Sequence, residues 1–432
     1  MQNAGHPGQD RVTPARLMLC PVFCVLCPVF CVLCSVSCVL CPVFCPMSSV
    51  MISCGEASGD LYAGALAQEI ARLDPAARVF GFGGDHLAAA GAELLGDYRG
   101  LAVTGLVEAV RVLPRSLAMY RRLVAAARDR RPDVFVAIDF PDFNFRLAGA
   151  LRRLGVPVVY YVSPQIWAWR RGRMRTMKRI ADRVLVIFPF EEAIYAEAGV
   201  AVEFVGHPLV DLAHASRPRN GFLTAIGLDP AAPTVALLPG SRPNEVRQIL
   251  PVLARARELV ADRVPGVQFV VARAPHLDAA LFAPLASSRL GMPATVESRT
   301  DDVLAASDVV ITASGTATVQ AALHERPMVI VYRLSPLTYK LGKRFVLVDM
   351  YGMVNLVAGR RVVPELIQKG LTAEAVAQET IRYLTDADHR ERTRQALGEV
   401  VVKLGAGGAS RRAAEAVLRV ARQATAVHAG RS

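Results

Sequence analysis

The chain has 432 residues, of which 53% are hydrophobic and 20% are charged. This length suffices for two or three domains with sizeable cores, so it excludes a mini-protein that depends on disulfides or metals for its stability. The composition also excludes a mainly disordered chain, which would combine low hydrophobicity with high charge. Lys and Arg number 50 against 38 Asp and Glu, which gives a net charge of +12. This excess indicates an anionic partner, such as phosphate groups, nucleic acid or an acidic membrane surface.

The first feature along the chain is a cysteine-rich tract. Eight of the nine cysteines lie within it, at positions 20, 24, 27, 31, 34, 38, 41 and 45. The tract repeats the heptad Cys-Pro-Val-Phe-Cys-Val-Leu, and a repeat of this regularity is typical of a tandemly repeated stretch of DNA. We therefore interpret residues 1–46 as low-complexity sequence outside the fold, with translation starting at Met47 or Met51.

A membrane anchor is the alternative interpretation of this tract. Residues 17–44 are uncharged, and their number exceeds the roughly 20 residues that span a bilayer. Prolines at positions 21, 28 and 42 disfavour an anchor, because each removes a helical hydrogen bond. A cleaved signal peptide and a thiolate metal site are disfavoured too, since the tract has no clear cleavage site and no interleaved histidines.

From Ser48 onward, short β-branched runs alternate with longer stretches of helical period, which predicts parallel sheets covered by helices. The predicted strands are residues 49–54, 78–82, 134–138, 156–162, 183–187, 234–238, 267–272, 309–312 and 328–332. The predicted helices are residues 60–73, 113–130, 145–154, 172–180, 190–198, 244–262, 277–286 and 317–323. After Leu366 we expect helices and no further strand.

This order predicts an α/β protein with two Rossmann-like, doubly wound domains that face a cleft, followed by a helical C-terminal tail. We expect the first domain at residues 47–205, the second at residues 206–370 and the C-terminal helices at residues 371–432. Ligands of such folds bind at the carboxyl ends of the strands. The loops that follow strands are therefore the places to look for functional residues.

Two glycine-rich loops follow the first two strands. The loop Cys54-Gly-Glu-Ala-Ser-Gly-Asp60 offers a helix N-terminus to an anionic or hydroxyl-rich ligand. It is equally typical of a turn in which Ser58 or Asp60 caps the helix. Because it lacks the Gly-Lys-Ser/Thr ending of a P-loop, nucleoside triphosphate hydrolysis is disfavoured. The second loop has His86 where a dinucleotide-binding fingerprint requires glycine, so a dehydrogenase is disfavoured as well.

The loop Asp139-Phe-Pro-Asp-Phe-Asn144 ends an apolar strand. A carboxylate in this position can lie in the cleft, have its pKa raised by burial and accept a proton. Asp139 is the first candidate for such a base and Asp142 the second. The alternative for Asp142 and Asn144 is that they cap the next helix. The following strand leads into a loop that contains Trp167 and Trp169, which suit a sugar or acyl ligand but also an ordinary core.

Two further loops have the composition of a phosphate site. In Leu238-Pro-Gly-Ser-Arg242, Gly240 and Ser241 allow close approach to the backbone, and Arg242 can bind two phosphate oxygens. A pyrophosphate fits this pattern. Ser314-Gly-Thr-Ala-Thr318 repeats the arrangement after a later strand, with Gly315 and Thr316 at the start of a helix.

Metal ligation is poorly supported by the sequence. The sole Asp-x-Asp motif, at residues 386–388, lies in the C-terminal helical region, and the eight histidines show no paired ligand spacing on one helix face. We therefore predict no metal and no cofactor, with the charge of a leaving group stabilised by arginine and backbone N–H groups.

The order and number of these motifs make the chain resemble the lipid-A-disaccharide synthases, which are inverting UDP-sugar glycosyltransferases of the GT-B type with two Rossmann domains. The motifs that carry this resemblance are Gly55-Glu-Ala-Ser-Gly-Asp60, Gly105-Leu-Val-Glu108, Asp139-Phe-Pro-Asp-Phe-Asn144, Tyr161-Val-Ser-Pro164 with Trp167-Ala-Trp169, Gly206-His-Pro208, Leu238-Pro-Gly-Ser-Arg242, Ser314-Gly-Thr-Ala317 and Asn355-Leu-Val-Ala-Gly-Arg360. Two positions depart from the pattern. Gln320 stands where the family usually has a glutamate that resembles a ribose ligand, and Val354 stands where proline usually precedes Asn355.

The resemblance implies transfer of 2,3-diacylglucosamine from UDP-2,3-diacylglucosamine to the 6-hydroxyl of 2,3-diacylglucosamine 1-phosphate, with inversion and release of UDP. In this reading Asp139, or else Asp142, is the base, and Gly240, Ser241 and Arg242 receive the diphosphate. The remainder of UDP is expected at Gly315, Thr316, Gln320 and Asn355. The acceptor is expected at Gly55, Glu56, Ser58 and Asp60.

The resemblance also implies a location at the cytoplasmic face of the inner membrane, with contact to surface lipids and no nucleic-acid partner. Residues 167–183 hold seven basic side chains against one Asp, a composition that suits anionic headgroups as well as a solvated helix face. Two other functions stay open. One is a UDP-sugar 2-epimerase, and the other is a nucleotide-sugar-binding protein without turnover.

Overall fold

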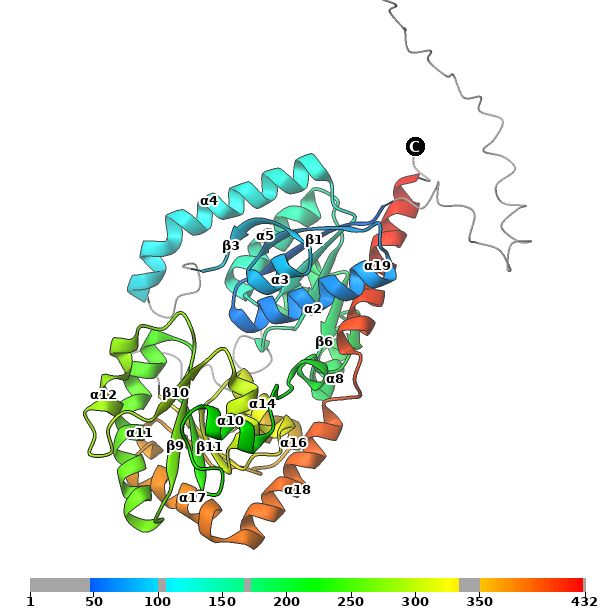
Figure 1. Ribbon diagram of the computed structural model, residues 1–432. Coiled ribbons are helices and arrows are strands. Elements are labelled where there is room, and N and C mark those ends of the chain that lie inside the picture. The colour runs from blue at the N-terminus through cyan, green and yellow to red at the C-terminus, as the bar shows by residue number, and fades with distance from the viewer. Residues whose placement is uncertain (1–46, 100–105, 167–171, 334–349, 430–432) are drawn as a thin grey trace, which may run out of the picture. The chain divides into compact units, whose positions relative to one another are not determined.

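A computed structural model describes residues 47–99, 106–166, 172–333 and 350–429, with the side chains of residues 106–111 and 425–429 left out of the description. The chain forms two parallel sheets (Figure 1). The first sheet has the strand order β3-β2-β1-β4-β5-β6-β7 and the second the order β10-β9-β8-β11-β12-β13. This confirms the α/β class with two Rossmann-like units.

The first sheet and its helices occupy residues 49–204. Its strands are β1 (Ser49–Cys54), β2 (Arg78–Gly83), β3 (Glu93–Asp97), β4 (Val134–Ile138), β5 (Val158–Tyr161), β6 (Arg183–Val186) and β7 (Val202–Phe204). The helices between them are α2 (Ala57–Leu73), α3 (Asp85–Ala89), α4 (Leu106–Arg130), α5 (Pro141–Arg153), α7 (Arg173–Ile180) and α8 (Pro189–Glu197).

The second sheet is formed by β8 (Thr234–Leu238), β9 (Gln268–Arg273), β10 (Ala294–Glu297), β11 (Val309–Ala313), β12 (Met328–Tyr332) and β13 (Glu365–Ile367). Its helices are α9 (Leu209–Leu212), α10 (Arg219–Ala225), α11 (Pro243–Arg263), α12 (Ala283–Ala286), α13 (Thr300–Ala306), α14 (Thr316–Leu323) and α16 (Met353–Ala358). The chain ends with α17 (Ala373–Thr385), α18 (Ala387–Lys403) and α19 (Ala409–Ala429).

The central strands are apolar on both faces because helices cover both sides of each sheet. In β1, Val50 and Ile52 belong to one buried cluster, whereas Met51, between them, belongs to another on the opposite face. β8 divides in the same way, with Val235 on one side and Ala236 on the other. Period-two alternation therefore supplies two cores for each sheet.

The sequence analysis did not predict four strands of the structure, β3, β7, β10 and β13. Each has three to five residues, and all four lie at the edge of a sheet. Their side chains are mostly half-buried, so they lack the continuous apolar run that marks a central strand. β13 ends one residue beyond Leu366, where we expected only helices.

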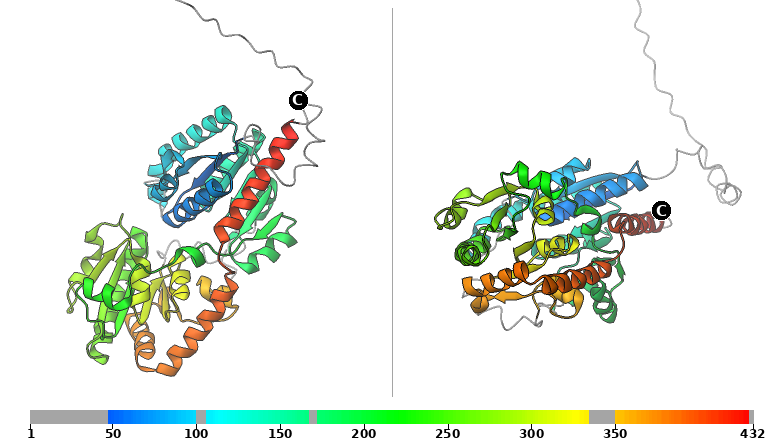
Figure 2. Two further views of the ribbon diagram at one scale, coloured as in Figure 1. Left: turned by 45° about the vertical axis from the view of Figure 1, so that its right-hand side comes forward. Right: turned by 60° about the horizontal axis from the view of Figure 1, so that its bottom comes forward.

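The last helix returns to the first sheet. α17 packs against α11 of the second sheet, and α19 packs along α2 of the first (Figure 2). The carboxylate of Asp211, in α9, accepts hydrogen bonds from Gly408 N and Ala409 N at 2.7 and 3.1 Å and so caps α19. Arg412 donates to the carbonyl oxygens of Val205 and Gly407. These contacts attach the C-terminal helix to the segment that joins the two sheets.

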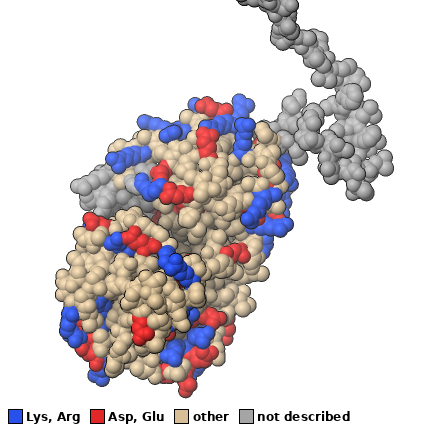
Figure 3. Space-filling view, viewed as in Figure 1, with Lys and Arg blue, Asp and Glu red and all other residues tan. Residues whose placement is uncertain are grey.

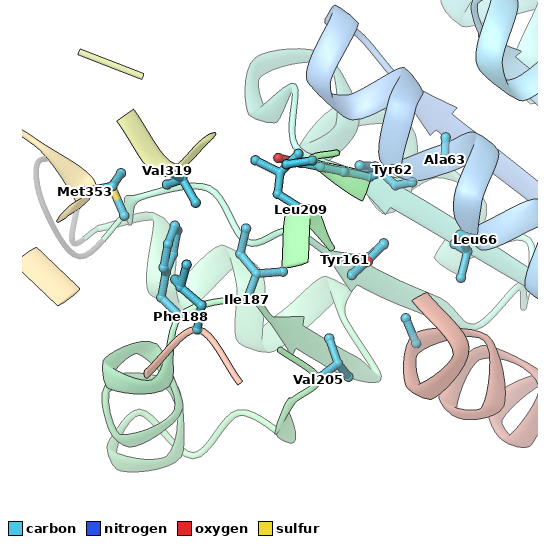
Figure 4. Close-up of a cluster of buried hydrophobic side chains, with 14 of the residues drawn as sticks. Tyr62, Ala63, Leu66, Tyr161, Ile187, Phe188, Val205, Leu209, Val319 and Met353 are labelled. Atoms are coloured by element: carbon cyan, nitrogen blue, oxygen red, sulfur yellow. The ribbon is translucent and has the colours of Figure 1, made fainter. Parts of the chain in front are cut away.

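One buried cluster continues from the first sheet to helices of the second (Figure 4). Tyr62 and Leu66 enter it from α2, and Val319 and Met353 enter it from α14 and α16. Leu209, Ile187 and Phe188 lie between these groups in the close-up. The two sheets are therefore joined by apolar packing as well as by the chain.

Candidate active site

The turn after β4 has an unusual backbone conformation. Asp139 and Phe140 have φ values of +45° and +47°, in the left-handed region that non-glycine residues rarely adopt. The buried amide of Asn144 donates to the carbonyl oxygens of Ile138 and Asp139 at 3.2 and 2.9 Å. The hydroxyl of Tyr160 donates to Asp139 O at 2.8 Å. These bonds hold Asp139 and Phe140 in a strained turn at the carboxyl end of β4.

Asn144 also connects this turn to β1. Its side-chain oxygen accepts a bond of 2.7 Å from the Ser53 hydroxyl. The neighbouring Gly55 is required sterically, since a Cβ there would lie 2.1 Å from the ring of Phe140. The two motifs that carry Gly55 and Asp139 are therefore packed against each other. Of the two caps considered for this helix, Asn144 proves to be a buried cross-link.

The pKa of Asp139 is raised to about 7, chiefly by burial and also by the nearby Glu56 carboxylate. Arg242 and a backbone hydrogen bond from Phe140 act in the opposite direction and lower the pKa. The direction of the shift agrees with the sequence-based expectation, because removing a carboxylate from water disfavours its charged form. The side chain of Asp142 differs, since it is 74% exposed and forms an ion pair with Arg173.

Arg242 comes from the second sheet and lies beside the N-terminus of α2. One of its terminal nitrogens is 2.7 and 2.8 Å from the two carboxylate oxygens of Glu56. The other is 3.0 Å from Glu245 Oε1. Burial lowers the pKa of Arg242, but the two carboxylates outweigh this effect and hold the pKa above its usual value. A fully charged guanidinium thus lies at the start of α11, where the helix dipole also favours anions.

The loop before Arg242 is shaped by its glycine. Gly240 has a φ of +120°, and a Cβ there would lie 2.7 Å from a carboxylate oxygen of Glu245. His276, which follows β9, has its Nε2 2.8 Å from Ser241 O. The sequence analysis missed His276, although it stands four residues beyond a predicted strand. A search of every loop after a strand would have found it.

The second glycine-and-hydroxyl loop lies near Tyr62 of α2. Gly315 is the N-cap of α14, and Thr316 is its first residue. The Thr316 side chain interacts with the hydroxyl of Tyr62, whose pKa is raised by burial and by the charges of Tyr161 and Asp139. Tyr62 therefore connects the donor-side loop with the neighbourhood of Asp139. No signal in the sequence marks it, because a tyrosine within an amphipathic helix is indistinguishable from core.

Two predicted ligand residues have their side chains occupied within the protein. Asn355 is fully buried, donating to Val363 O and Glu365 at 2.9 and 2.8 Å and accepting from Val362 N and Val363 N at 2.8 and 3.1 Å. Asp60 is 1% exposed and accepts from the backbone N–H groups of residues 84, 86 and 87, at the start of α3. Neither Ser58 nor Asp60 caps α2, whose N-cap is Glu56.

The other predicted site residues lie in varied surroundings. Ser58 is half-buried in the first turn of α2. The amide nitrogen of Gln320 donates to the carboxylate of Asp301. His207, from the Gly-His-Pro motif, is buried between Tyr62 and Phe188, and burial lowers its pKa to about 3, so the ring is neutral. Gly105, Trp167 and Trp169 lie outside the described residues, as does the side chain of Glu108.

Within the described residues, no group of three His, Cys, Asp or Glu side chains is arranged to hold a metal ion. The same part of the chain contains no helix that is both long and apolar enough to cross a membrane.

Comparisons with solved structures concern the fold. A UDP-GlcNAc 2-epimerase from Neisseria meningitidis, crystallised with UDP-GlcNAc, shares 11% identity and a TM-score of 0.63 over 86% of this chain and 100% of that chain. A calicheamicin glycosyltransferase shares 18% identity and a TM-score of 0.54 over 87% of this chain and 98% of that chain. At these identities the likeness extends to the arrangement of two Rossmann-like units and no further.

Comparisons of sequence are more specific. A family model described as lipid-A-disaccharide synthetase matches residues 50–420. The lipid-A-disaccharide synthase of Geobacter metallireducens is 47% identical over 379 residues, which cover 87% of this chain and 98% of that protein. The enzyme of Myxococcus xanthus is 45% identical, covering 86% of this chain and 97% of that protein. Since these matches span both sheets and nearly all of each relative, the chain belongs to the lipid-A-disaccharide synthase family of glycosyltransferases, which act in lipid A biosynthesis.

Proposed function

We propose that the protein transfers 2,3-diacylglucosamine from UDP-2,3-diacylglucosamine to the 6-hydroxyl of 2,3-diacylglucosamine 1-phosphate. The anomeric configuration inverts and UDP is released. Family membership supports the class of reaction. The observation that carries the proposal is that Glu56 and Arg242, which form an ion pair, lie close enough to Asp139 for both charges to influence its ionisation.

Asp139 is the proposed base. A sugar hydroxyl is a poor nucleophile at neutral pH, so its proton must leave as the new bond to the anomeric carbon forms. A base works best when its pKa is near the working pH, and the pKa of Asp139 is about 7. In the proposed step the acceptor O6 attacks C1 of the donor sugar, the O6 proton passes to the Asp139 carboxylate, and the bond from C1 to the phosphate oxygen breaks.

Arg242 is the proposed ligand of the departing diphosphate, with the backbone of Gly240 and Ser241 beside it. A diphosphate would compete with Glu56 and Glu245 for the guanidinium. Once phosphate neutralises Arg242, the lowering effect of Arg242 on the pKa of Asp139 weakens. Asp139 then becomes a stronger base when the donor is bound. Gly315 and Thr316 are proposed to contact the rest of UDP, and Gly55, Glu56 and Ser58 the acceptor.

Asp60 and Asn355 are proposed to act indirectly. Their side chains are saturated by backbone groups, so their contribution is to position the loops at residues 84–87 and 362–365. Asp142 remains the second candidate for the base, since it lies three residues from Asp139. Its high exposure and its ion pair with Arg173 favour Asp139.

The experiment that tests this function is an assay of UDP release with and without the acylated acceptor. A transferase releases UDP only when the acceptor is present. A 2-epimerase interconverts UDP-sugars without any acceptor, and a binding protein does neither. Epimerase activity on the donor alone, without a disaccharide product, would contradict the proposed reaction.

We further propose that the protein acts at the cytoplasmic face of the inner membrane and contacts its surface lipids. Support comes from two helices of the first sheet. α7 exposes Arg175, Lys178 and Arg179. α4 exposes Leu113 and Leu117, at 56% and 45%, within a basic sequence, and Figure 3 shows Lys or Arg side chains over this region. Apolar side chains flanked by positive charge suit an anionic lipid surface.

Vesicle sedimentation tests the membrane contact. The protein is expected to bind vesicles that contain phosphatidylglycerol and not pure phosphatidylcholine vesicles, with binding that weakens as salt is raised. Leu113→Ser together with Leu117→Ser should reduce binding, whereas Val402→Ser, at a site 79% exposed on α18, serves as the control. Equal binding by both variants and the original protein would contradict a contact through α4.

The domain boundaries are also a proposal. We place the acceptor domain at residues 47–205, the donor domain at residues 206–370 and the C-terminal helices at residues 371–432. The ends of the two sheets, at β7 and β13, support these limits. Residues 1–46 are proposed to lie outside the enzymatic fold.

A further inference from the structure

Three polar side chains of α13 and of the end of α14 form a hydrogen-bonded group, of which the sequence analysis singled out only Gln320. The Gln320 amide nitrogen is 3.2 and 3.3 Å from the two carboxylate oxygens of Asp301. His324 Nε2 is 3.0 Å from Asp301 Oδ1. Asp301 belongs to α13, whereas Gln320 and His324 bracket one turn at the end of α14. The two helices pack against each other.

This group lies at the ligand edge of the sheet. α13 starts three residues after β10, and α14 starts three residues after β11. Because all strands of the sheet are parallel, both helix N-termini stand at the carboxyl edge. Asp301 is the second residue of α13, and Gln320 is the fifth residue of α14. Both therefore lie within about one turn of the edge where nucleotides bind in this class of fold.

The carboxylate of Asp301 is more exposed and accepts fewer hydrogen bonds than that of its neighbour Asp302. The side chain of Asp302 is 3% exposed, and it is bonded to Ser216, Arg217 and Arg299. The Asp301 side chain is 23% exposed. Within the described residues, its only hydrogen-bond donors are Gln320 and His324. Across that same part of the chain, the Gln320 side-chain oxygen has no hydrogen-bond donor. Asp301 and Gln320 thus present two adjacent side-chain oxygens that can accept hydrogen bonds.

Two adjacent acceptors match a vicinal diol. A carboxylate that follows a strand of a Rossmann-like sheet is a general ligand for ribose hydroxyls, and hydrogen bonds to a charged oxygen are stronger than those between neutral groups. We propose that Asp301, oriented by Gln320 and His324, binds the ribose hydroxyls of the nucleotide donor, with Gln320 Oε1 as the second acceptor. Gln320 thereby orients a carboxylate that another helix supplies. This inference rests on the proposed use of UDP-sugar as the donor.

A ribose-specific measurement separates this role from a structural one. Calorimetry on the full chain would compare UDP with 2′,3′-dideoxy-UDP, which keeps the uracil and the diphosphate but lacks both hydroxyls. The original protein should bind UDP at least tenfold more tightly. In Asp301→Asn this preference should fall to less than about threefold, mainly through weaker UDP binding. Asp262→Asn, at an exposed ion pair on α11, is the matched control and should keep the preference.

An exchange of the two groups provides a second test. Gln320→Glu alone places two carboxylates together and should weaken UDP binding. Asp301→Asn combined with Gln320→Glu restores one amide and one carboxylate, and it should recover the preference to within about threefold of the original. A folded exchange variant without that preference overturns the proposal, as does an Asp301→Asn variant that weakens both nucleotides equally or neither.

The failure of the underlying function would look different. If the original protein binds neither UDP nor its dideoxy form, the proposed donor is wrong. If it binds both nucleotides equally and Arg242→Ala still weakens both, the donor site stands and the assignment of Asp301 alone is wrong.

Discussion

Glu56, the N-cap of α2, and Arg242, in the loop after β8, form an ion pair across 186 positions of sequence, with one nitrogen of Arg242 2.7 and 2.8 Å from the two carboxylate oxygens. Both side chains are about one-third exposed, at 34% and 37%. Solvent therefore reaches the pair, and an anionic ligand can compete for Arg242. The pair joins the proposed acceptor side to the proposed diphosphate side, and both charges act on Asp139.

Asp139→Asn is expected to reduce turnover by at least about a hundredfold, since a positioned base contributes about 10² to 10⁴-fold. Asparagine keeps the volume and removes the basicity, so UDP affinity should stay unchanged. Steady-state kinetics with calorimetry for UDP measure both. The control is Asp142→Asn, which should retain most activity because that side chain is exposed. The reverse outcome, an active Asp139→Asn and an inactive Asp142→Asn, would move the base by three residues.

The pH profile of kcat/KM should rise through about pH 7 on its acid side, because Asp139 must be ionised to act as a base and its pKa is about 7. The ratio kcat/KM, which reports ionisations of the free enzyme, is measured from about pH 3.5 to about pH 9. A limb that rises near pH 4 would instead indicate a carboxylate with an ordinary pKa.

Asp139→Asn is also expected to stabilise the protein at alkaline pH. The folded state keeps the Asp139 proton up to about pH 7, whereas an unfolded aspartate releases its proton near pH 3.9. The folded state thus binds more protons between these values, and its stability falls as pH rises through this window. Asparagine cannot ionise, so the Asp139→Asn variant does not lose this stability as the pH rises.

Denaturant unfolding at pH 4 and pH 8 measures this stability difference. The gain should be close to zero at pH 4 and roughly 1 to 3 kcal/mol at pH 8, below the full value of about 1.4 kcal/mol per pKa unit because the side chain is partly exposed. A gain that is equal at both pH values would show that burial does not control the ionisation of Asp139.

Arg242→Ala is expected to weaken UDP binding by about 1.5 to 3 kcal/mol, the usual contribution of a hydrogen bond to a charged group. Turnover should fall further, because negative charge grows on the diphosphate as it leaves. The control is Arg255→Ala, which removes an exposed arginine from the same helix. Calorimetry that shows unchanged UDP affinity in Arg242→Ala would remove Arg242 from the phosphate site.

Asn355→Ala is expected to lower the free energy of unfolding by about 2 to 4 kcal/mol, since it leaves the buried backbone groups of Val362 and Val363 without their partner. Protein that still folds should bind UDP with nearly normal affinity, because the side chain is fully buried. Chemical denaturation and calorimetry measure the two effects, with Gln395→Ala on the surface of α18 as the control. A stable variant that has lost UDP affinity would make Asn355 a direct ligand.

Truncation at two methionines should give different results. A chain that starts at Met47 keeps all of β1 and is expected to fold and to retain activity. A chain that starts at Met51 loses the hydrogen bonds of Ser48 and Ser49 and the fully buried Val50. It should be less stable by roughly 2 to 4 kcal/mol. Thermal melting of both chains measures the difference, and an insoluble Met47 chain would support the anchor interpretation of the cysteine tract.

The sequence by itself determined the fold class and most of the central strands. β1, β4, β8 and β11 are buried on both faces, so their apolar runs are continuous and their ends are marked by glycine or aspartate. The same local logic located the loops with Asp139 and Arg242, because parallel strands bring their following loops to one edge. It also predicted that burial raises the pKa of Asp139.

Only the tertiary structure decided which of these loop residues meet. The pairing of Glu56 with Arg242 depends on how two separately patterned units pack, and no local period encodes it. Asp60 and Asn355 carry polar side chains that suit a ligand, yet distant backbone N–H groups saturate them. Asp301 and Tyr62 gave no signal because their partners come from other elements, at separations of 19 residues and more. The short edge strands were not predicted for a related reason. Pairing with a neighbouring strand stabilises them, whereas their own hydrophobic pattern is too weak to mark them as strands.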